Sequence, residues 1–442
     1  MNCKVRFAPS PTGFMHIGNA RIAIINYLFC KQNKGKYLFR IDDTDVARSK
    51  KEYEDAIIQD LKWLGISWDE TFRQSERLER YKDVMNKLIA KGILYECFET
   101  QEELDYKRKI AINKGIAPVY DRSALKLSDV EKERLRSQGI KSYWRFKLPN
   151  KTVSWNDLIL GEISYALNSV SDPVIVKADG TFLYTFSSVI DDIDSGITHI
   201  IRGQDHVTNT AVQIAMFDEI SDSKYQVQFA HLSLLVNKDG SQFSKRLGSM
   251  NLSDIRNQGV DPMAISDLLA TLGSSLDTMP FTNMNDLVEY FDITKFSTNS
   301  PKFDMNEILN VNKKIMHQKN YEEIKEYGIS EKAFEIIKDN ISTYNDFNIW
   351  KCILDTDYKA TYKPNEEQTN VIKTAIDELQ NSEIDENVMN RIKEKSDASG
   401  KALYIPLRMA LTDMEHGPNL LKLLELFGKE IVLKRFTEAL KR

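Results

Sequence analysis

Strand-like and helix-like segments alternate at the start of the chain, and this alternation limits the fold more than any other feature. Residues 4–8 (KVRFA) have the pattern of a short strand, SPTG at 10–13 is a turn sequence, and a helical apolar pattern begins at Gly18. A second strand is predicted at 36–41 and a second helix at 51–63. Alternation of this kind predicts a parallel, doubly wound α/β sheet.

The rest of the chain changes pattern twice. Residues 76–183 combine charged helical stretches with several strand-like segments, and we interpret them as an inserted α+β unit. The strand–helix alternation resumes at Tyr184, and after Ser253 the apolar spacing is mainly helical. A chain of 442 residues is also too long for one hydrophobic core. The expected fold class is α/β: a Rossmann-type parallel sheet interrupted by an α+β insertion, followed by an all-helical C-terminal part.

Composition and charge limit the class of protein. The chain is 42% hydrophobic and 28% charged, has no run of about 18 apolar residues and shows no secretory signal. Its net charge of -5 argues against coating nucleic acid through a general positive field, although a local basic patch could still bind RNA. The four cysteines form no CxxC pair, so a disulfide framework or zinc ribbon is not expected. These features predict a cytoplasmic protein that binds no membrane.

The segment 8–29 (APSPTGFMHIGNARIAIINYLF) carries the first chemical signal. His16 and Gly18 fall at the predicted start of a helix, where backbone N–H groups favour phosphate and glycine permits close approach. A histidine there can donate hydrogen bonds to oxygens on which charge builds. Taken alone, a surface turn whose histidine caps nothing is the commoner interpretation.

The second signal is GSQFSKRLGS (240–249), a loop bracketed by glycines. Its Ser244, Lys245 and Arg246 could clamp a triphosphate, because lysine is a compact charge and arginine a fork of donors for phosphate oxygens. Taken alone, a solvated basic loop is the commoner meaning of SKR. The two segments lie in order on either side of a sheet broken by an insertion, and this arrangement favours a nucleotide site.

Together these segments resemble the two signatures of class I aminoacyl-tRNA synthetases. HIGN at 16–19 is similar to the HIGH motif, with Asn19 in place of the second histidine. QFSKR at 242–246 is similar to the KMSKS loop, with Lys245 as its second lysine. The flanking sequence resembles the glutamyl enzymes of that class, in blocks at 6–21, 40–49, 60–70, 172–192, 200–210, 230–246 and 402–430.

The resemblance implies two binding sites. ATP would be bound by His16, Gly18, Asn19, Ser244, Lys245 and Arg246, with His16 and Lys245 catalytic. Glutamate would be held by Arg6, Ser10, Asp42, Tyr184, Ser188 and Arg202, with Asp42 facing its amino group. Arg6 and Arg202 follow or end predicted strands, where open α/β sheets bind ligands, and arginine offers two parallel hydrogen bonds to a carboxylate. Without the resemblance, a structural ion pair explains each arginine equally well.

The resemblance also implies the reaction. The α-carboxylate of glutamate attacks the α-phosphate of ATP, with Mg²⁺ on the phosphates, to give glutamyl-adenylate and pyrophosphate. The terminal 2′-hydroxyl of a tRNA then attacks the activated carbonyl. The implied domains are the two halves of the catalytic sheet (1–75 and 184–238), an acceptor-stem-binding insertion (76–183), a loop and stem-contact region (239–310) and a helical anticodon-binding domain (311–442).

Three positions depart from the family pattern. Asp42 stands where glutamate is usual, Ser188 where asparagine is frequent, and Gln242 replaces the first lysine of the loop motif. Because His16 and Lys245 remain, an active enzyme is expected. Some relatives hold zinc in the inserted unit, but of their ligands only Cys97 matches, with Glu99 and Ala124 at other ligand positions. No zinc and no protein-bound metal are therefore expected.

Several alternatives remain open at this stage. A truncated relative that glutamylates queuosine in a tRNA anticodon would lack residues 311–442, and a small nucleotidyltransferase with an HxGH motif would not need this length. A catalytically inactive paralogue that binds tRNA or regulates is suggested only by Asp42 and Gln242.

The tRNA partner is also open. It could be tRNA(Glu), tRNA(Gln) or both, because an enzyme that also charges tRNA(Gln) has the same active site and differs in the anticodon domain. Residues 333–350 contain no arginine, where a discriminating enzyme could place one, and this is a hint of relaxed or altered specificity. We expect a monomer that binds no DNA. Tyr344 and Trp350 could stack on unpaired bases if they are exposed, but core positions are the favoured interpretation.

Overall fold

The chain divides into two compact units. The computed structural model describes residues 2–241 and 251–442. Unit 1 comprises Met1–Ile255 and Ile265–Met305, and unit 2 comprises Arg256–Ala264 and Asn306–Arg442. Within the described residues, no helix is long and apolar enough to cross a membrane.

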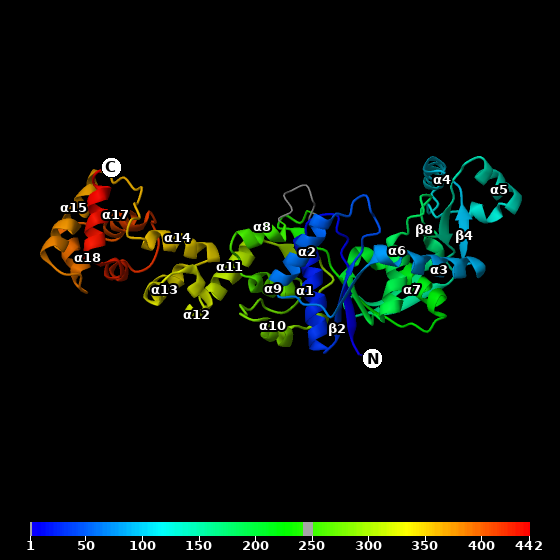
Figure 1. Cartoon of the computed structure of the whole chain (residues 1–442), viewed down its shortest axis with the longest axis horizontal. Helices are drawn as coiled ribbons and strands as arrows, with labels where there is room; N and C mark the ends of the chain where they lie inside the picture. The colour runs from blue at the N-terminus through cyan, green and yellow to red at the C-terminus, as the bar shows by residue number, and fades with distance from the viewer. Residues whose placement is uncertain (1, 242–250) are drawn as a thin grey trace. The chain divides into compact units, whose positions relative to one another are not determined.

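Unit 1 begins with a parallel sheet. β1 (Lys4–Phe7) pairs in parallel with β2 (Lys36–Ile41), which pairs in parallel with β3 (Glu70–Arg73). The connections contain α1 (Ile17–Gln32), which packs against β1 and β2, and α2 (Lys51–Trp63) (Figure 1). The predicted alternation of strands and helices is confirmed here, and the apolar strand residues are buried as a parallel sheet requires.

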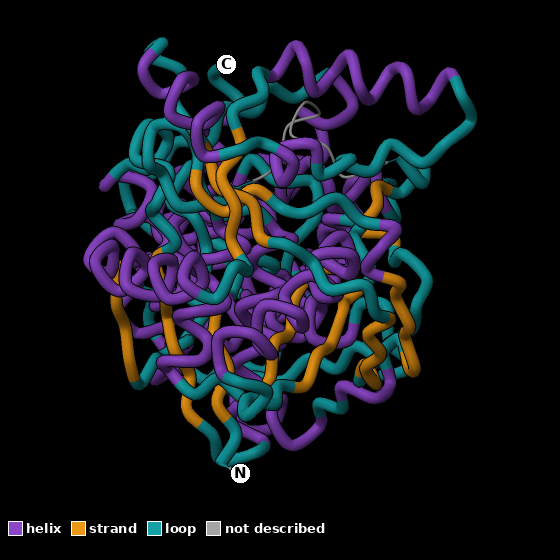
Figure 2. Tube along the Cα trace, turned by 90° about the vertical axis from the view of Figure 1, so that its right-hand side faces the viewer, coloured by secondary structure: helices purple, strands orange, loops and turns teal. Residues whose placement is uncertain are grey.

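A later part of the chain extends this sheet beside β1. The Thr198 N–H, just before β9 (His199–Gly203), donates to the Lys4 carbonyl oxygen (2.9 Å), and β10 (Gln228–Leu232) pairs in parallel with β9. The regular hydrogen-bonded ladders are β1-β2-β3 and β9-β10, and the Thr198–Lys4 contact places β9 beside β1. The combined order β3-β2-β1-β9-β10 is that of a Rossmann sheet, and it reverses between β1 and β9. Figure 2 shows the strands among the helices. Ligands of such sheets bind at the carboxyl ends of the strands at this reversal.

The range 76–183 contributes to two sheets rather than one. A separate antiparallel sheet contains β4 (Leu94–Cys97), β5 (Tyr143–Phe146) and β8 (Val174–Val176). β6 (Thr152–Asp157) and β7 (Gly161–Ala166) form a hairpin, and β6 pairs with β10 of the main sheet. The helices of this range are α3 (Leu78–Ala90), α4 (Gln101–Asn113) and α5 (Asp129–Ser137). Two strands assigned to the inserted unit therefore extend the main sheet.

The remaining elements of unit 1 surround this sheet. α6 (Tyr184–Ser195) and α7 (Val207–Ser221) pack against each other. A small two-stranded sheet joins β11 (Val236–Asn237) to β12 (Lys302–Phe303). The helices that follow β11 are α8 (Leu252–Asn257), α9 (Pro262–Thr271), which begins in unit 2, and α10 (Met284–Tyr290).

Unit 2 is helical. Its helices are α11 (Met305–Met316), α12 (Tyr321–Ile324), α13 (Glu331–Ile337), α14 (Tyr344–Leu354), α15 (Glu366–Asn381), α16 (Val388–Ser396), α17 (Lys401–Thr412) and α18 (Leu420–Ala439). Trp350 is buried in their shared core, and Tyr344 packs against that core while its hydroxyl donates to Asp261 Oδ2 (2.7 Å). The interpretation of both aromatic residues as core residues is confirmed.

A buried carboxylate ties α15 to α16 within unit 2. Glu378 accepts hydrogen bonds from Lys395 Nζ (2.5 Å), Ser382 Oγ (2.6 Å) and Arg391 Nε (2.5 Å). These donors lower the pKa of Glu378 to about 2, from an ordinary value of 4.5. A depressed folded-state pKa means that the ionised carboxylate stabilises unit 2 above pH 4.5, and that this contribution is lost as the pH falls toward 2.

Glu378→Gln should therefore lower the melting temperature at neutral pH, and the difference from wild type should narrow below about pH 4. Thermal unfolding followed by circular dichroism across this pH range measures both effects. A difference that stays constant with pH would mean that the charge of Glu378 is not what stabilises the contact.

Candidate active site

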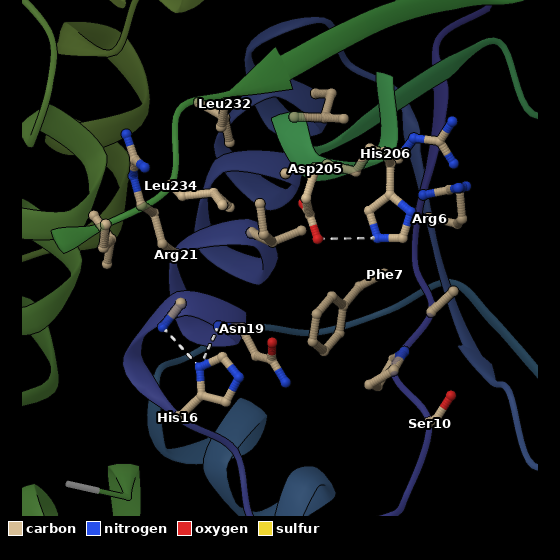
Figure 3. A pocket seen from close by; sticks show the side chains of 18 of the residues that line it. Arg6, Phe7, Ser10, His16, Asn19, Arg21, Asp205, His206, Leu232 and Leu234 are labelled. Atoms are coloured by element: carbon tan, nitrogen blue, oxygen red, sulfur yellow. Dashed lines mark hydrogen bonds and ion pairs between the residues drawn. The ribbon is translucent and has the colours of Figure 1, made fainter. Parts of the chain in front are cut away.

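A cavity of about 530 Å³ lies at the carboxyl ends of β1, β9 and β10, where the strand order reverses. Figure 3 shows the side chains that surround it. Seven residues predicted from the sequence line it: Arg6, Ser10, His16, Gly18, Asn19, Tyr184 and Arg202. They come from segments nearly 200 residues apart in the chain, and the sheet brings them together.

His16 is the N-cap of α1. Its Nδ1 accepts hydrogen bonds from the backbone N–H groups of Gly18 (3.1 Å) and Asn19 (3.4 Å), drawn as dashed lines in Figure 3. Because Nδ1 is an acceptor, the proton of the neutral ring is on Nε2, which is then a donor. The interpretation of a histidine that caps nothing is wrong. The cap instead fixes the tautomer that can donate to an anion at the helix N-terminus.

Gly18 leaves the space that this cap needs. A Cβ atom at position 18 would lie 3.0 Å from His16 Cε1 and 3.1 Å from His16 Nδ1. Both separations are tighter than ordinary van der Waals contact, so a side chain at this position would displace the imidazole ring. The glycine of the HIGN sequence therefore sets the position of its histidine.

A buried ion network lies behind the cavity. Arg40 is fully buried and donates from Nε to Asp42 Oδ1 (2.6 Å) and from Nη1 to Asp192 Oδ1 (2.7 Å). Asp192 also pairs with Arg6, whose Nε lies 3.3 Å from its Oδ1. The charge of Arg6 is therefore balanced by a carboxylate inside the protein.

Two predicted glutamate ligands belong to this network and do not line the cavity. Arg40 Nη2 donates to Ser188 Oγ (2.8 Å), and Asp42 turns toward the same guanidinium. Burial raises the pKa of Asp42 to about 6, and Arg40 opposes this shift. The aspartate is one methylene shorter than the glutamate usual in the family, and its carboxylate binds the arginine two residues before it. A direct contact of either residue with glutamate stays a prediction.

Arg202, at the end of β9, differs from Arg6 in its charge balance. Its Nη2 donates to Thr210 Oγ1 (2.6 Å) and Gln213 Oε1 (2.7 Å), and its Nε to His231 Nε2 (3.4 Å). Nη1 is buried and has no hydrogen-bond partner among the described residues, none of whose carboxylates pairs with this arginine. Burial lowers the pKa of Arg202, but a guanidinium keeps its proton. The cavity thus contains a buried cation with one nitrogen available.

Asp205 and His206 line the cavity as well, and the sequence interpretation gave them no role. They follow Arg202 after the end of β9, and the ring of His206 lies 6.0 Å from that of Tyr184. Burial and the nearby Arg202 lower the pKa of His206. Both residues come shortly after Arg202, just past the end of β9, and this position is the sequence signal that could have identified them.

The second predicted segment lies outside the described residues. Gln242, Ser244, Lys245 and Arg246 all fall within 242–250, so their roles stay predictions.

At Cys97 and Glu99, where no zinc is expected, the side chains contact other protein groups. The Glu99 carboxylate accepts from Tyr120 Oη (2.6 Å) and Ser123 Oγ (2.8 Å). Burial raises the pKa of the Cys97 thiol to about 11, so it is protonated at neutral pH. Among the residues that the structure describes, no three His, Cys, Asp or Glu side chains are grouped to hold a metal.

Comparison with known proteins agrees with this geometry. The catalytic-domain family of tRNA synthetases class I (E and Q) matches residues 2–310, and an anticodon binding domain matches residues 300–440. Glutamate–tRNA ligase 1 of Maricaulis maris is 44% identical over 98% of both chains. Glutamate–tRNA ligase 2 of Gluconobacter oxydans is 42% identical over 99% of both. A crystal structure of a glutamate tRNA ligase from Elizabethkingia meningosepticum in complex with its amino acid is 26% identical, with a TM-score of 0.84 over 100% of this chain and 99% of that one.

The Rossmann sheet, the cavity at its strand reversal and the catalytic-domain match together define a class I aminoacyl-tRNA synthetase. Within that class, the chain belongs to the glutamate–tRNA ligases, with which it aligns over nearly its whole length. The names of these relatives support neither tRNA(Gln) as the substrate nor a role limited to binding or regulation.

Gly18→Ala should displace the His16 ring and lower the rate of glutamate- and tRNA-dependent pyrophosphate exchange by about 10-fold or more, since the reacting groups must be held within a fraction of an ångström. Gly13→Ala is the matched control, because a Cβ at Gly13 meets nothing within 4 Å. The melting temperatures of both variants should stay close to that of wild type. Equal exchange rates in the two variants would contradict the role given to Gly18.

Proposed function

We propose that the cavity binds L-glutamate with its side-chain carboxylate at Arg202 Nη1 and its α-carboxylate toward His16. As a member of its family, the enzyme attaches glutamate to tRNA with ATP. The observation that carries the proposal is the buried guanidinium nitrogen of Arg202, which lacks a partner among the described residues. A carboxylate supplies the charge and the acceptor that this nitrogen needs.

The orientation follows from the reaction. The α-carboxylate must reach the α-phosphate of ATP, and phosphate is favoured where His16 and the first N–H groups of α1 lie. Figure 3 shows His16 and Arg6 on opposite sides of the cavity. Arg202 lines the same cavity and is 5% exposed, so its guanidinium can receive the side-chain carboxylate away from solvent.

This arrangement selects glutamate over glutamine. A bound glutamine would place a neutral amide beside a buried cation that forms no ion pair with a described carboxylate. An unbalanced buried charge costs several kcal/mol, which is about the energy needed for strong discrimination. Arg6 is already balanced by Asp192 and supplies hydrogen bonds more than net charge.

The other predicted ligands contribute in two ways. Ser10 and Tyr184 line the cavity and can hydrogen-bond the substrate directly. Asp42 and Ser188 act from behind the cavity: they hold Arg40, which with Asp192 positions Arg6.

ATP is placed at the N-terminus of α1. His16 Nε2–H donates to an α-phosphate oxygen while glutamate attacks phosphorus and the bond to pyrophosphate breaks. Gly18 and Asn19 lie at the same helix end, and the 242–250 segment supplies Ser244, Lys245 and Arg246 to the phosphates. Among the described residues that line the cavity, Asp205 is the one with a carboxylate, so Mg²⁺ fits best as a cation carried by the phosphate oxygens.

The tRNA is proposed to use the rest of the chain. Residues 76–183 are assigned to the acceptor end, whose 2′-hydroxyl attacks the glutamyl-adenylate and releases AMP. Residues 239–310 are assigned to the loop and stem contacts, and 311–442 to the anticodon. The anticodon assignment is supported by the match of residues 300–440 to an anticodon binding domain.

Gln213→Glu tests the charge of Arg202. The new carboxylate would lie where Gln213 Oε1 now accepts from Arg202 Nη2, and it would balance the guanidinium from within the protein. The KM for glutamate should rise at least about 10-fold, because an internal ion pair then competes with the substrate. Steady-state aminoacylation of tRNA(Glu) measures it, with Gln228→Glu at the exposed start of β10 as the control. An unchanged KM in Gln213→Glu would contradict the assignment.

Lys245→Ala tests the loop. It should lower tRNA-supported pyrophosphate exchange by roughly 100-fold or more, since it removes a cation aimed at charge that develops in the transition state. The exposed Lys224→Ala should leave the rate unchanged. An unchanged rate in Lys245→Ala would show that this loop does not act on the phosphates.

A further inference from the structure

A chain of hydrogen bonds runs from β6 to Arg202 through a buried histidine. His231, in β10, is fully buried, and its Nδ1 lies 2.5 Å from Asp157 Oδ2 at the end of β6. The backbone N–H of His231 donates to the other oxygen, Asp157 Oδ1 (3.1 Å). The opposite ring nitrogen, His231 Nε2, faces Arg202 Nε (3.4 Å) and Thr210 Oγ1 (2.8 Å).

These contacts set the tautomer of His231. A carboxylate accepts only, so Nδ1 carries a proton and donates to Asp157. Burial lowers the pKa of His231, and the neighbouring Arg202 acts in the same direction, so the ring is neutral and Nε2 is an acceptor. The Arg202 Nε–H group and the Thr210 hydroxyl both lie within hydrogen-bond distance of this acceptor.

Arg202 has five N–H bonds, and its neighbours use three of them. One Nε–H faces His231 Nε2, and the two on Nη2 face Thr210 and Gln213. The two on Nη1 are the ones without a described partner. All three acceptors are neutral side-chain atoms, so they orient the guanidinium without balancing its charge.

We propose that Asp157 and His231 are positioning residues that hold Arg202 with Nη1 toward the carboxylate of glutamate. Asp157 fixes the tautomer, and the fixed tautomer supplies the acceptor for Arg202 Nε–H, one of the three acceptors that orient the guanidinium. This inference rests on the proposed function, in which Arg202 binds the substrate. In this arrangement β6 of the β6–β7 hairpin pairs with β10 and so brings Asp157 beside His231.

Matched substitutions of His231 test the acceptor separately from the fold. His231→Gln keeps an oxygen near the position of Nε2, whereas His231→Met has the same length and no such acceptor. His231→Asn keeps a donor near the position of Nδ1 but removes the acceptor. The KM for glutamate should rise about 10-fold or more in the Asn and Met variants, because a hydrogen bond to a charged group is lost. In His231→Gln it should stay within about 3-fold of wild type, and the KM for ATP should be unchanged in all three.

Three outcomes would overturn the inference: an unchanged KM for glutamate in the Asn and Met variants, an equal rise in all three, or a larger rise in His231→Gln. If one acceptor-free variant does not fold, the other carries the comparison with His231→Gln. His199→Gln is the control for the loss of a histidine from the sheet, because His199 is the first residue of β9 and the cavity lies at the carboxyl ends of the strands. This variant should leave the KM for glutamate unchanged.

Arg202→Gln separates this inference from the proposed function. The KM for glutamate should rise by about 100-fold in that variant, as for a buried charged contact. An unchanged KM in Arg202→Gln would overturn the proposed function itself. A large rise in Arg202→Gln together with no effect of the His231 variants would overturn only the positioning role.

Discussion

The active cavity depends on β1 and β9 lying side by side. The two strands are nearly 200 residues apart in the chain, and Lys4 and Thr198 join them by hydrogen bonds through backbone and side-chain atoms. The strand order reverses at this junction, so the connections of the two strands leave on opposite sides and open a cavity between them. Arg6 and Arg202 reach that cavity from the two strands. Without this contact between β1 and β9, the two arginines would not line the same cavity.

The two arginines are in different electrostatic situations. Arg6 pairs with Asp192, which also binds Arg40, so its charge is satisfied before any substrate arrives. Arg202 is held by neutral acceptors, and its Nη1 is buried without a partner among the described residues. A buried, unbalanced cation is costly in the free protein, and a ligand that balances it recovers that free energy. In the proposed function glutamate does so and glutamine does not.

Much of this could be predicted from the sequence. Strand and helix periods near the N-terminus identified the first half of the sheet. HIGN was expected at the start of a helix and the two arginines at strand ends, where such sheets bind ligands. Membership of the family followed from blocks spread along the chain. Local patterns could not say which strands pair, so the β6–β7 hairpin was assigned to the inserted unit although β6 pairs with β10.

Side-chain partners were harder still to predict. Asp42 and Ser188 were expected in the cavity, but both bind Arg40. The buried guanidinium of Arg40 needs acceptors, and these two short side chains beside it supply them. Asp157 lies outside the blocks that carry the family resemblance, and His231 lies in the 230–246 block without a predicted role. Their role becomes visible only when β6, β9 and β10 lie together, since they are 74 residues apart in the chain.

The proposed function places the side-chain carboxylate of glutamate at Arg202 Nη1, and a crystal structure of the enzyme with bound L-glutamate measures this contact. We expect a carboxylate oxygen at hydrogen-bond distance from Nη1, about 2.7–3.0 Å, with the α-carboxylate on the His16 side. Glutamate bound with neither carboxylate at Arg202, or with the α-carboxylate there, would contradict it.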